Sequence, residues 1–161
     1  MFVYPDKEFN QLALADALGV SSTAISKSLK RLVKEGLIVL DKEKWQISIS
    51  LNRGNPAVIG LKRAENLRML YDSGLCMFLF DSFPGATLVV FGSYSFGEDV
   101  SSSDIDIAVI GSSEKDTSLD AFEKILHRKI VLQFYPSLGK IHKYLKDNIL
   151  NGILIKGGFE I

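Results

Sequence analysis

GSYSFGEDVSSSDIDIAVIG, residues 92–111, is the stretch that decides how the second half of the chain folds. It follows ATLVVF at 86–91, an apolar run with the composition of a strand buried on both faces. Its own DIDIAVI segment, residues 104–110, predicts a second strand, in which Asp104 and Asp106 point to the same face. Two carboxylates at neighbouring positions on one face repel each other and resist burial. The stretch therefore indicates a site that requires a compensating positive charge.

A divalent cation would remove the repulsion between Asp104 and Asp106. Mg²⁺ in proteins takes one or two carboxylates together with phosphate oxygens of a substrate. Gly92 and Ser93 supply the other half of such a site, because glycine lets the backbone approach a ligand closely, and free N–H groups with a hydroxyl at a turn can hold a phosphate. A phosphate-binding turn beside two carboxylates suits phosphoryl or nucleotidyl transfer. We expect Mg²⁺, or Mn²⁺, as the cofactor.

The spacing of these residues resembles the G-S-x10-D-x-D signature of the DNA polymerase β-like nucleotidyltransferase superfamily, and above all its minimal nucleotidyltransferases. The resemblance covers about residues 84–157. It implies a small mixed-sheet domain of the polymerase β-like palm type, in which Gly92 and Ser93 bind the phosphates of an NTP. Asp104 and Asp106 would be the catalytic, metal-binding residues. A hydroxyl of an acceptor, such as a partner protein, an RNA end or a small molecule, would attack the α-phosphate and release pyrophosphate.

Two departures from the family pattern bear on catalysis. The family usually adds a third carboxylate from a later strand, here KIVLQFY at 129–135, where alignment on the usual basic pair gives Val131 and a shift of two residues gives Gln133. Neither residue is acidic. The turn often reads G-S-x-A-R-G in the family and has Phe96 in place of the arginine here. The alternative to an enzyme is therefore a DNA-binding regulator or antitoxin-like protein whose nucleotidyltransferase domain binds nucleotide or a partner without catalysis.

Residues 9–50 predict two helices followed by a two-stranded wing. FNQLALADALGV contains the turn glycine Gly19, and the second helix opens on Ser21, a good N-cap, and closes at Gly36. LIVLD and WQISIS follow as β-rich runs around a charged turn. Helix, tight turn, helix and wing is the order of a winged helix-turn-helix, and ALADALGVSSTAISKSLKRLVKEGLI resembles the winged-helix regulators in sequence.

The outer face of the second predicted helix is basic, with four cations and one acid between residues 21 and 35 and thus a net charge of +3. In modules of this class the second helix enters the major groove of DNA. The residues for base edges are Ser22, Thr23, Ser26 and Lys27, and those for phosphates are Lys30, Arg31, Lys42 and Lys44. DNA is therefore an expected partner, although the whole chain has 19 cationic and 19 acidic side chains and no net charge.

The remaining segments complete an α+β fold. Pro56 is placed to begin a helix, and helical spacing of apolar residues continues to about Phe83 with a break at Ser73 and Gly74. Further on, the pattern predicts a helix at about 118–128, a helix from Leu138 to Gly152, and a short terminal strand. We expect a winged helix-turn-helix at 1–52, a helical connector packing on both halves at 53–83, and a minimal nucleotidyltransferase domain at 84–161.

The composition is that of an ordinary folded protein, with 161 residues of which 47% are apolar and 24% charged. The single cysteine, Cys76, excludes an internal disulfide and fits a reducing compartment. The N-terminus lacks the pattern of a signal peptide, and no apolar run is long enough to span a bilayer. We expect a cytoplasmic protein without a membrane partner. Only a short segment precedes Gln11, so support for the winged helix-turn-helix is expected from residues 56–83 or from a second subunit in a homodimer.

Overall fold

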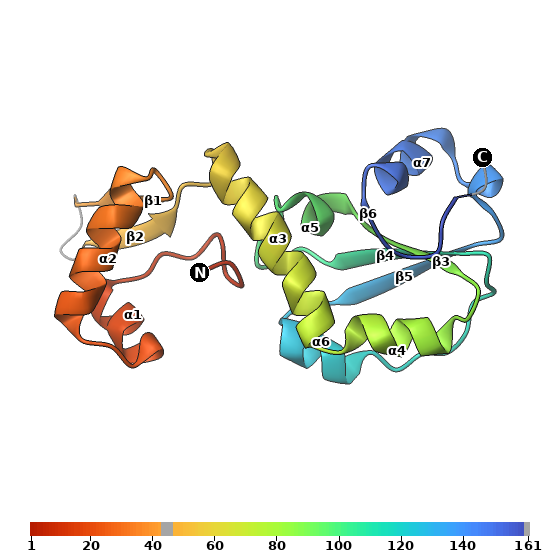
Figure 1. The fold of residues 1–161 in the computed structure, drawn as a ribbon, viewed down its shortest axis with the longest axis horizontal. Coiled ribbons are helices and arrows are strands. Elements are labelled where there is room, and N and C mark those ends of the chain that lie inside the picture. The colour runs from red at the N-terminus through yellow and green to blue at the C-terminus, as the bar shows by residue number, and fades with distance from the viewer. Residues whose placement is uncertain (43–46, 160–161) are drawn as a thin grey trace.

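The N-terminal part of the chain has the expected order of helix, turn, helix and wing (Figure 1). The computed structural model describes residues 1–42 and 47–159. Its first elements are α1 (Gln11–Leu18), α2 (Ser22–Lys34), β1 (Ile38–Asp41) and β2 (Ser48–Leu51), and the two strands pair antiparallel. The Ser21 hydroxyl accepts from the backbone N–H of Ala24 at 3.2 Å, and Gly19 ends α1 with a φ of 63°. Both predicted helix boundaries are confirmed.

The core of this unit is small, and the segment before α1 helps to close it. Its buried apolar side chains are Ala15, Ile25, Leu29, Ile38 and Ile49. Met1 packs against them, and Phe9 exchanges two backbone hydrogen bonds with Ile49 at 2.9 and 2.8 Å. Leu12 and Leu18 of α1 remain exposed. The segment before α1 therefore supports the unit in part, whereas the sequence predicted support from residues 56–83 or from a second subunit.

Two helices follow the wing, α3 (Pro56–Asp72) and α4 (Leu75–Ser82). Pro56 occupies the first turn of α3, and the Asn55 side chain caps it by accepting from the N–H of Ala57 at 2.9 Å. Gly74, with a φ of 80°, separates the helices as the break in the pattern predicts. Helix α3 packs on α4 and on α5 (Gly92–Phe96). The boundaries 1–52, 53–83 and 84–161 stay a prediction, because tertiary contacts cross them.

The C-terminal half contains a four-stranded mixed sheet in the order β5-β4-β3-β6. Its strands are β3 (Thr87–Phe91), β4 (Ile105–Ile110), β5 (Ile130–Tyr135) and β6 (Ile153–Lys156). Strand β3 pairs antiparallel with β4 and with β6, whereas β4 and β5 are parallel. The α+β class and the mixed sheet expected from the resemblance are therefore confirmed.

Helices cover both faces of this sheet (Figure 1). Leu75 and Leu79 of α4 and Leu126 of α6 (Asp120–Leu126) belong to the larger core, which includes Ile105 and Ile107. On the other face, Ile141 and Ile149 pack against Val89, Phe91, Ala108 and Ile110. Since side chains alternate along β4, Asp106 points to this second face.

The last helical region differs from the prediction of one helix from Leu138 to Gly152. A short 3₁₀ turn, η1 (Leu138–Lys140), is followed by extended backbone at Ile141 and His142 and then by α7 (Lys143–Leu150). The interruption lets Ile141 enter the core beside the sheet. Apolar spacing alone does not distinguish this arrangement from a continuous helix. No helix in the described part of the chain is long and apolar enough to cross a membrane.

Candidate functional site

Strand β3 runs directly into the short helix α5, where the sequence analysis predicted only a turn. Phe91 lies opposite Asp106 in the β3–β4 register, which places Gly92 at the end of the sheet where β4 begins. Gly92 has a φ of 71°, and a Cβ at this position would lie 3.1 Å from Oδ2 of Asp106. Glycine is therefore required here for two reasons, the left-handed backbone and the close approach of a carboxylate.

The two predicted metal ligands differ in exposure. Asp104 is exposed and Asp106 is half-buried. Burial raises the pKa of Asp106, and the negative charge of Asp104 raises it further. A nearby cation would oppose both effects, because a positive charge stabilises the ionised carboxylate.

Gln133 is the residue of β5 whose side chain contacts this pair. Its Nε2 donates to Oδ1 of Asp106 at 3.4 Å, and its Oε1 accepts from the Tyr135 hydroxyl at 2.7 Å. Val131 lies opposite Asp106 in the strand register. Of the two positions that the sequence leaves open for a third carboxylate, Gln133 is nevertheless the one whose side chain makes a hydrogen bond with Asp106. Strand alternation predicts Val131, Gln133 and Tyr135 on one face of this strand, and the hydrogen bond between Gln133 and Tyr135 agrees with this.

The donor set fits a cation that receives its remaining ligands from a phosphate group. Within residues 1–42 and 47–159, no cluster of three or more acidic, histidine or cysteine side chains is arranged to hold a metal. Asp104 and Asp106 alone would hold Mg²⁺, which commonly binds proteins through one or two carboxylates together with substrate phosphates. Phe91, the N-cap of α5, makes no side-chain capping hydrogen bond, so the helix start at Gly92 and Ser93 is uncapped beside the pair.

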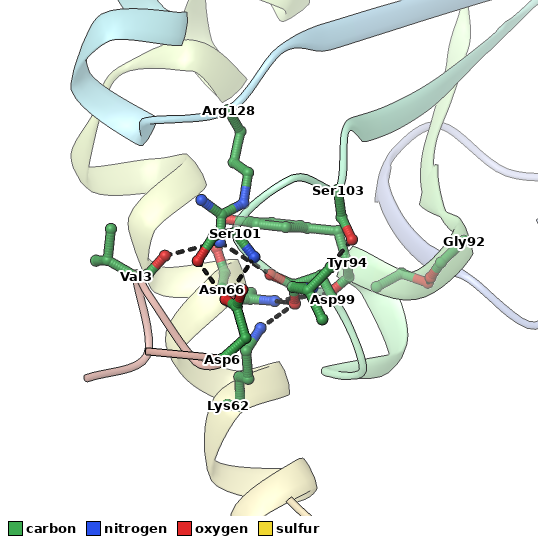
Figure 2. A network of polar contacts seen from close by, with 12 residues as sticks. Val3, Asp6, Lys62, Asn66, Gly92, Tyr94, Asp99, Ser101, Ser103 and Arg128 are labelled. Carbon is green, nitrogen blue, oxygen red and sulfur yellow. Dashed lines mark hydrogen bonds and ion pairs between the residues drawn. The ribbon is translucent and has the colours of Figure 1, made fainter. Parts of the chain in front are cut away.

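The loop that joins α5 to β4, residues 97–103, is held by a buried polar cluster that sequence analysis missed (Figure 2). Asp99 is 1% exposed and forms an ion pair with Lys62. Asn66 donates to Asp99 at 2.7 Å and to the backbone carbonyl of Tyr94 in α5 at 2.9 Å. Arg128 contacts the other Asp99 oxygen at 3.4 Å. A signal existed in the sequence, because Lys62 and Asn66 are four residues apart on the buried face of α3.

Asp99 and Glu98 precede β4 closely enough to be considered as a third carboxylate, and Asp99 does not serve as one. Asp99 is occupied by Lys62, Asn66 and Arg128, whereas Glu98 is exposed. Glu98 instead lines a small cavity of about 210 Å³ between the wing and α3, together with Lys62 and Arg53.

Helix α2 presents its predicted DNA-facing residues to solvent. Ser22, Thr23, Lys27, Lys30, Arg31 and Lys42 are exposed, and Ser26 is half-buried. Ile25 and Leu29 point inward, so the basic side chains occupy the opposite face. Arg31 forms an exposed pair with Glu35 at 3.7 Å, and Ser22 accepts from Gln11 at 3.1 Å. Lys44 lies outside the described residues.

Comparison with protein families identifies two domains in the chain. Residues 78–154 match the family model of the nucleotidyltransferase domain, and residues 10–39 match that of the winged helix-turn-helix DNA-binding domain. The chain is thus a fusion of an N-terminal winged helix-turn-helix with a nucleotidyltransferase domain, as the resemblance implied. Neither the curated proteins nor the solved structures gave a match.

Proposed function

We propose that the chain binds an NTP with Mg²⁺ at Asp104 and Asp106 and transfers the nucleoside monophosphate to a hydroxyl acceptor. The observation that carries this proposal is the approach of Gly92 to Asp106, which is so close that a Cβ on residue 92 would lie 3.1 Å from the carboxylate. Phosphates held at Gly92 and Ser93 would lie beside both carboxylates. The match of residues 78–154 to the nucleotidyltransferase domain supports the same reading.

The proposed reaction forms one bond and breaks one bond. The acceptor oxygen attacks the α-phosphorus, the bond from that phosphorus to the bridging oxygen breaks, and pyrophosphate leaves with the electron pair. The acceptor proton passes to a carboxylate of the pair or to water. Bound Mg²⁺ would neutralise the phosphate charge in this site. The chain itself supplies two carboxylates to hold the cation and the uncapped start of α5 to orient the phosphates.

Gln133 favours a second candidate function, a DNA-binding regulator that senses a nucleotide without transferring it. An amide beside Asp106 adds no negative charge to the metal site, whereas a carboxylate there would. A site with two carboxylates can hold one cation with its nucleotide more readily than two cations. Both candidate functions require binding of an NTP with Mg²⁺. They differ in whether the bond between the α-phosphorus and the bridging oxygen is broken.

Label transfer separates the two candidates. The protein is incubated with each α-labelled NTP, Mg²⁺ or Mn²⁺, and cell extract, beside Asp104→Asn/Asp106→Asn and a control, Asp116→Asn/Asp147→Asn, with the same charge change at exposed positions. Transfer by the wild type and the control, but not by Asp104→Asn/Asp106→Asn, is the expected result. Mg²⁺-dependent NTP binding without transfer would favour the sensor. No NTP binding at all would contradict both.

We further propose that α2 binds DNA, with Lys27 and Lys30 among its contacts. Each phosphate contact that is lost lowers the slope of log K against log salt by about 0.9. Lys27→Ala/Lys30→Ala is therefore expected to weaken binding about tenfold or more at low salt and to flatten the slope by roughly 1 to 2. Fluorescence anisotropy with a random duplex at several salt concentrations measures both. Lys115→Ala/Lys124→Ala, exposed in the other domain, is the matched control. Wild-type affinity and slope in the α2 variant would exclude this surface.

A further inference from the structure

The segment before α1 contacts both functional parts of the molecule. Residues 3–10, called here the N-terminal strap, lie against the 97–103 loop and the start of β5 at one end (Figure 2). At the other end they join the winged helix-turn-helix. A few residues with polar contacts at each end therefore connect the two functional parts.

The strap holds the outer side of the 97–103 loop. The Asp6 carboxylate accepts hydrogen bonds from both the backbone N–H of Ser101, at 2.8 Å, and its hydroxyl. These hydrogen bonds lower the pKa of Asp6, because they stabilise its ionised form. Ser103 stabilises the same loop, because its hydroxyl accepts from the N–H of Val100 at 2.9 Å. Asp104 follows directly in the chain.

The side chain that holds the buried side of the loop also holds α5. Asn66 bridges Asp99 and the carbonyl of Tyr94, which joins the loop to the phosphate-binding turn. Arg128 contacts Asp99 and also donates to the backbone carbonyl of Val3 in the strap at 2.7 Å. Displacement of the strap would therefore remove the hydrogen bonds to Ser101 of the loop and the hydrogen bond to Arg128, which contacts Asp99 on the buried side.

The opposite end of the strap is fixed to the DNA-binding unit. Phe9 pairs with Ile49 of β2, and the Asn10 side chain caps α1 by accepting from the N–H of Ala13 at 2.7 Å. Glu8 accepts from the Ser48 hydroxyl at 2.7 Å. A shift of α1 or of the wing on DNA would be transmitted to Asp6 through only a few residues.

We propose that the N-terminal strap couples the winged helix-turn-helix to the nucleotide site, with Asp6 as the positioning residue that orders the 97–103 loop. The proposal rests on the proposed function for its two ligands. It adds to that function that binding of DNA and binding of nucleotide affect each other. Since coupling is reciprocal, nucleotide changes the DNA affinity by the same factor by which DNA changes the nucleotide affinity.

Hydrogen exchange of the ligand-free protein tests whether Asp6 orders the 97–103 loop and the neighbouring nucleotide site. Asp6→Ala is expected to raise exchange about tenfold, as for the loss of a hydrogen bond to a charged group, at Ser101 and also across Gly92–Phe96 and Ile105. Asp16→Ala, with the same charge change on α1, should leave these amides unchanged. Ser101→Ala removes only the hydroxyl contact, so adding it to Asp6→Ala should raise exchange no further than Asp6→Ala alone does. Faster exchange confined to Ser101 would overturn the proposal.

A binding cycle tests the functional consequence. DNA affinity is measured with and without Mg²⁺ and ATP, and ATP affinity with and without DNA, for wild type, Asp6→Ala and Asp16→Ala. We expect the wild type and Asp16→Ala to have the same coupling factor. Asp6→Ala should have a coupling factor near 1, while its affinity for DNA alone and its affinity for ATP alone stay within about threefold of the wild-type values. Unchanged coupling in Asp6→Ala, or a wild-type factor of 1 with both ligands bound, would overturn the proposal. Failure of the wild type to bind one ligand would contradict the proposed function, and hydrogen exchange would then decide the link.

Discussion

Asp99→Asn is expected to lower the free energy of unfolding by about 3–5 kcal/mol, a large part of the stability of a domain of this size. Asp99 is the acidic partner of two cationic side chains, Lys62 and Arg128, each with a side chain only 3% exposed. Without the negative charge, both cations stay buried and uncompensated. Removal of one partner of a buried ion pair costs far more than the pair contributes in net stability.

Urea unfolding followed by circular dichroism measures this effect, with the midpoint and slope compared between variants. Asp72→Asn is the matched control, since it removes the acid of an exposed pair with Arg68 on the same helix region. Exposed pairs contribute little, so the control should unfold close to wild type. An Asp99→Asn midpoint as close to wild type as that of Asp72→Asn would show that the cluster is not buried as described.

Gln133→Glu is expected to strengthen Mg²⁺ binding roughly tenfold or more, because cation affinity rises with the negative charge of the donor set. The new carboxylate would lie beside Asp106, where the amide now donates at 3.4 Å. Without cation the same substitution should lower the melting temperature, since three carboxylates then repel each other. Added Mg²⁺ should restore it.

Thermal unfolding over a Mg²⁺ series measures both effects for Gln133→Glu. Gln133→Ala is the control, because it removes the amide without adding charge. If Gln133 is what limits catalysis, Gln133→Glu should also transfer more label than wild type. A Mg²⁺ dependence equal to that of Gln133→Ala would show that this position of β5 does not face the metal site.

The sequence predicts the parts of the site that depend on local pattern. Strand alternation places Asp104 and Asp106 on one face, and Gly92 is predicted at a point of close backbone approach. Both are features of a few consecutive residues. The match of the two family models confirms the fusion that these local patterns indicate.

The sequence pattern does not predict contacts between segments that are far apart in the chain. The pairs Asp99–Lys62, Arg128–Val3 and Asp6–Ser101 join residues 37, 125 and 95 positions apart. No periodicity in one segment specifies its partner in another. Val131 lies opposite Asp106 in the parallel register of β4 and β5, yet the longer side chain of Gln133 is the one that donates to Asp106, and no pattern within one strand predicts this. The break at Ile141 follows from packing against the sheet rather than from the helical spacing around it.

The most direct test of the central claim is a calorimetric titration of ATP, CTP, GTP and UTP into the protein with and without Mg²⁺. The account predicts binding of at least one NTP by the wild type that depends on Mg²⁺ and is lost in Asp104→Asn/Asp106→Asn, while Asp116→Asn/Asp147→Asn binds as the wild type does. Equal binding by wild type and Asp104→Asn/Asp106→Asn, or binding that is indifferent to Mg²⁺, would contradict it.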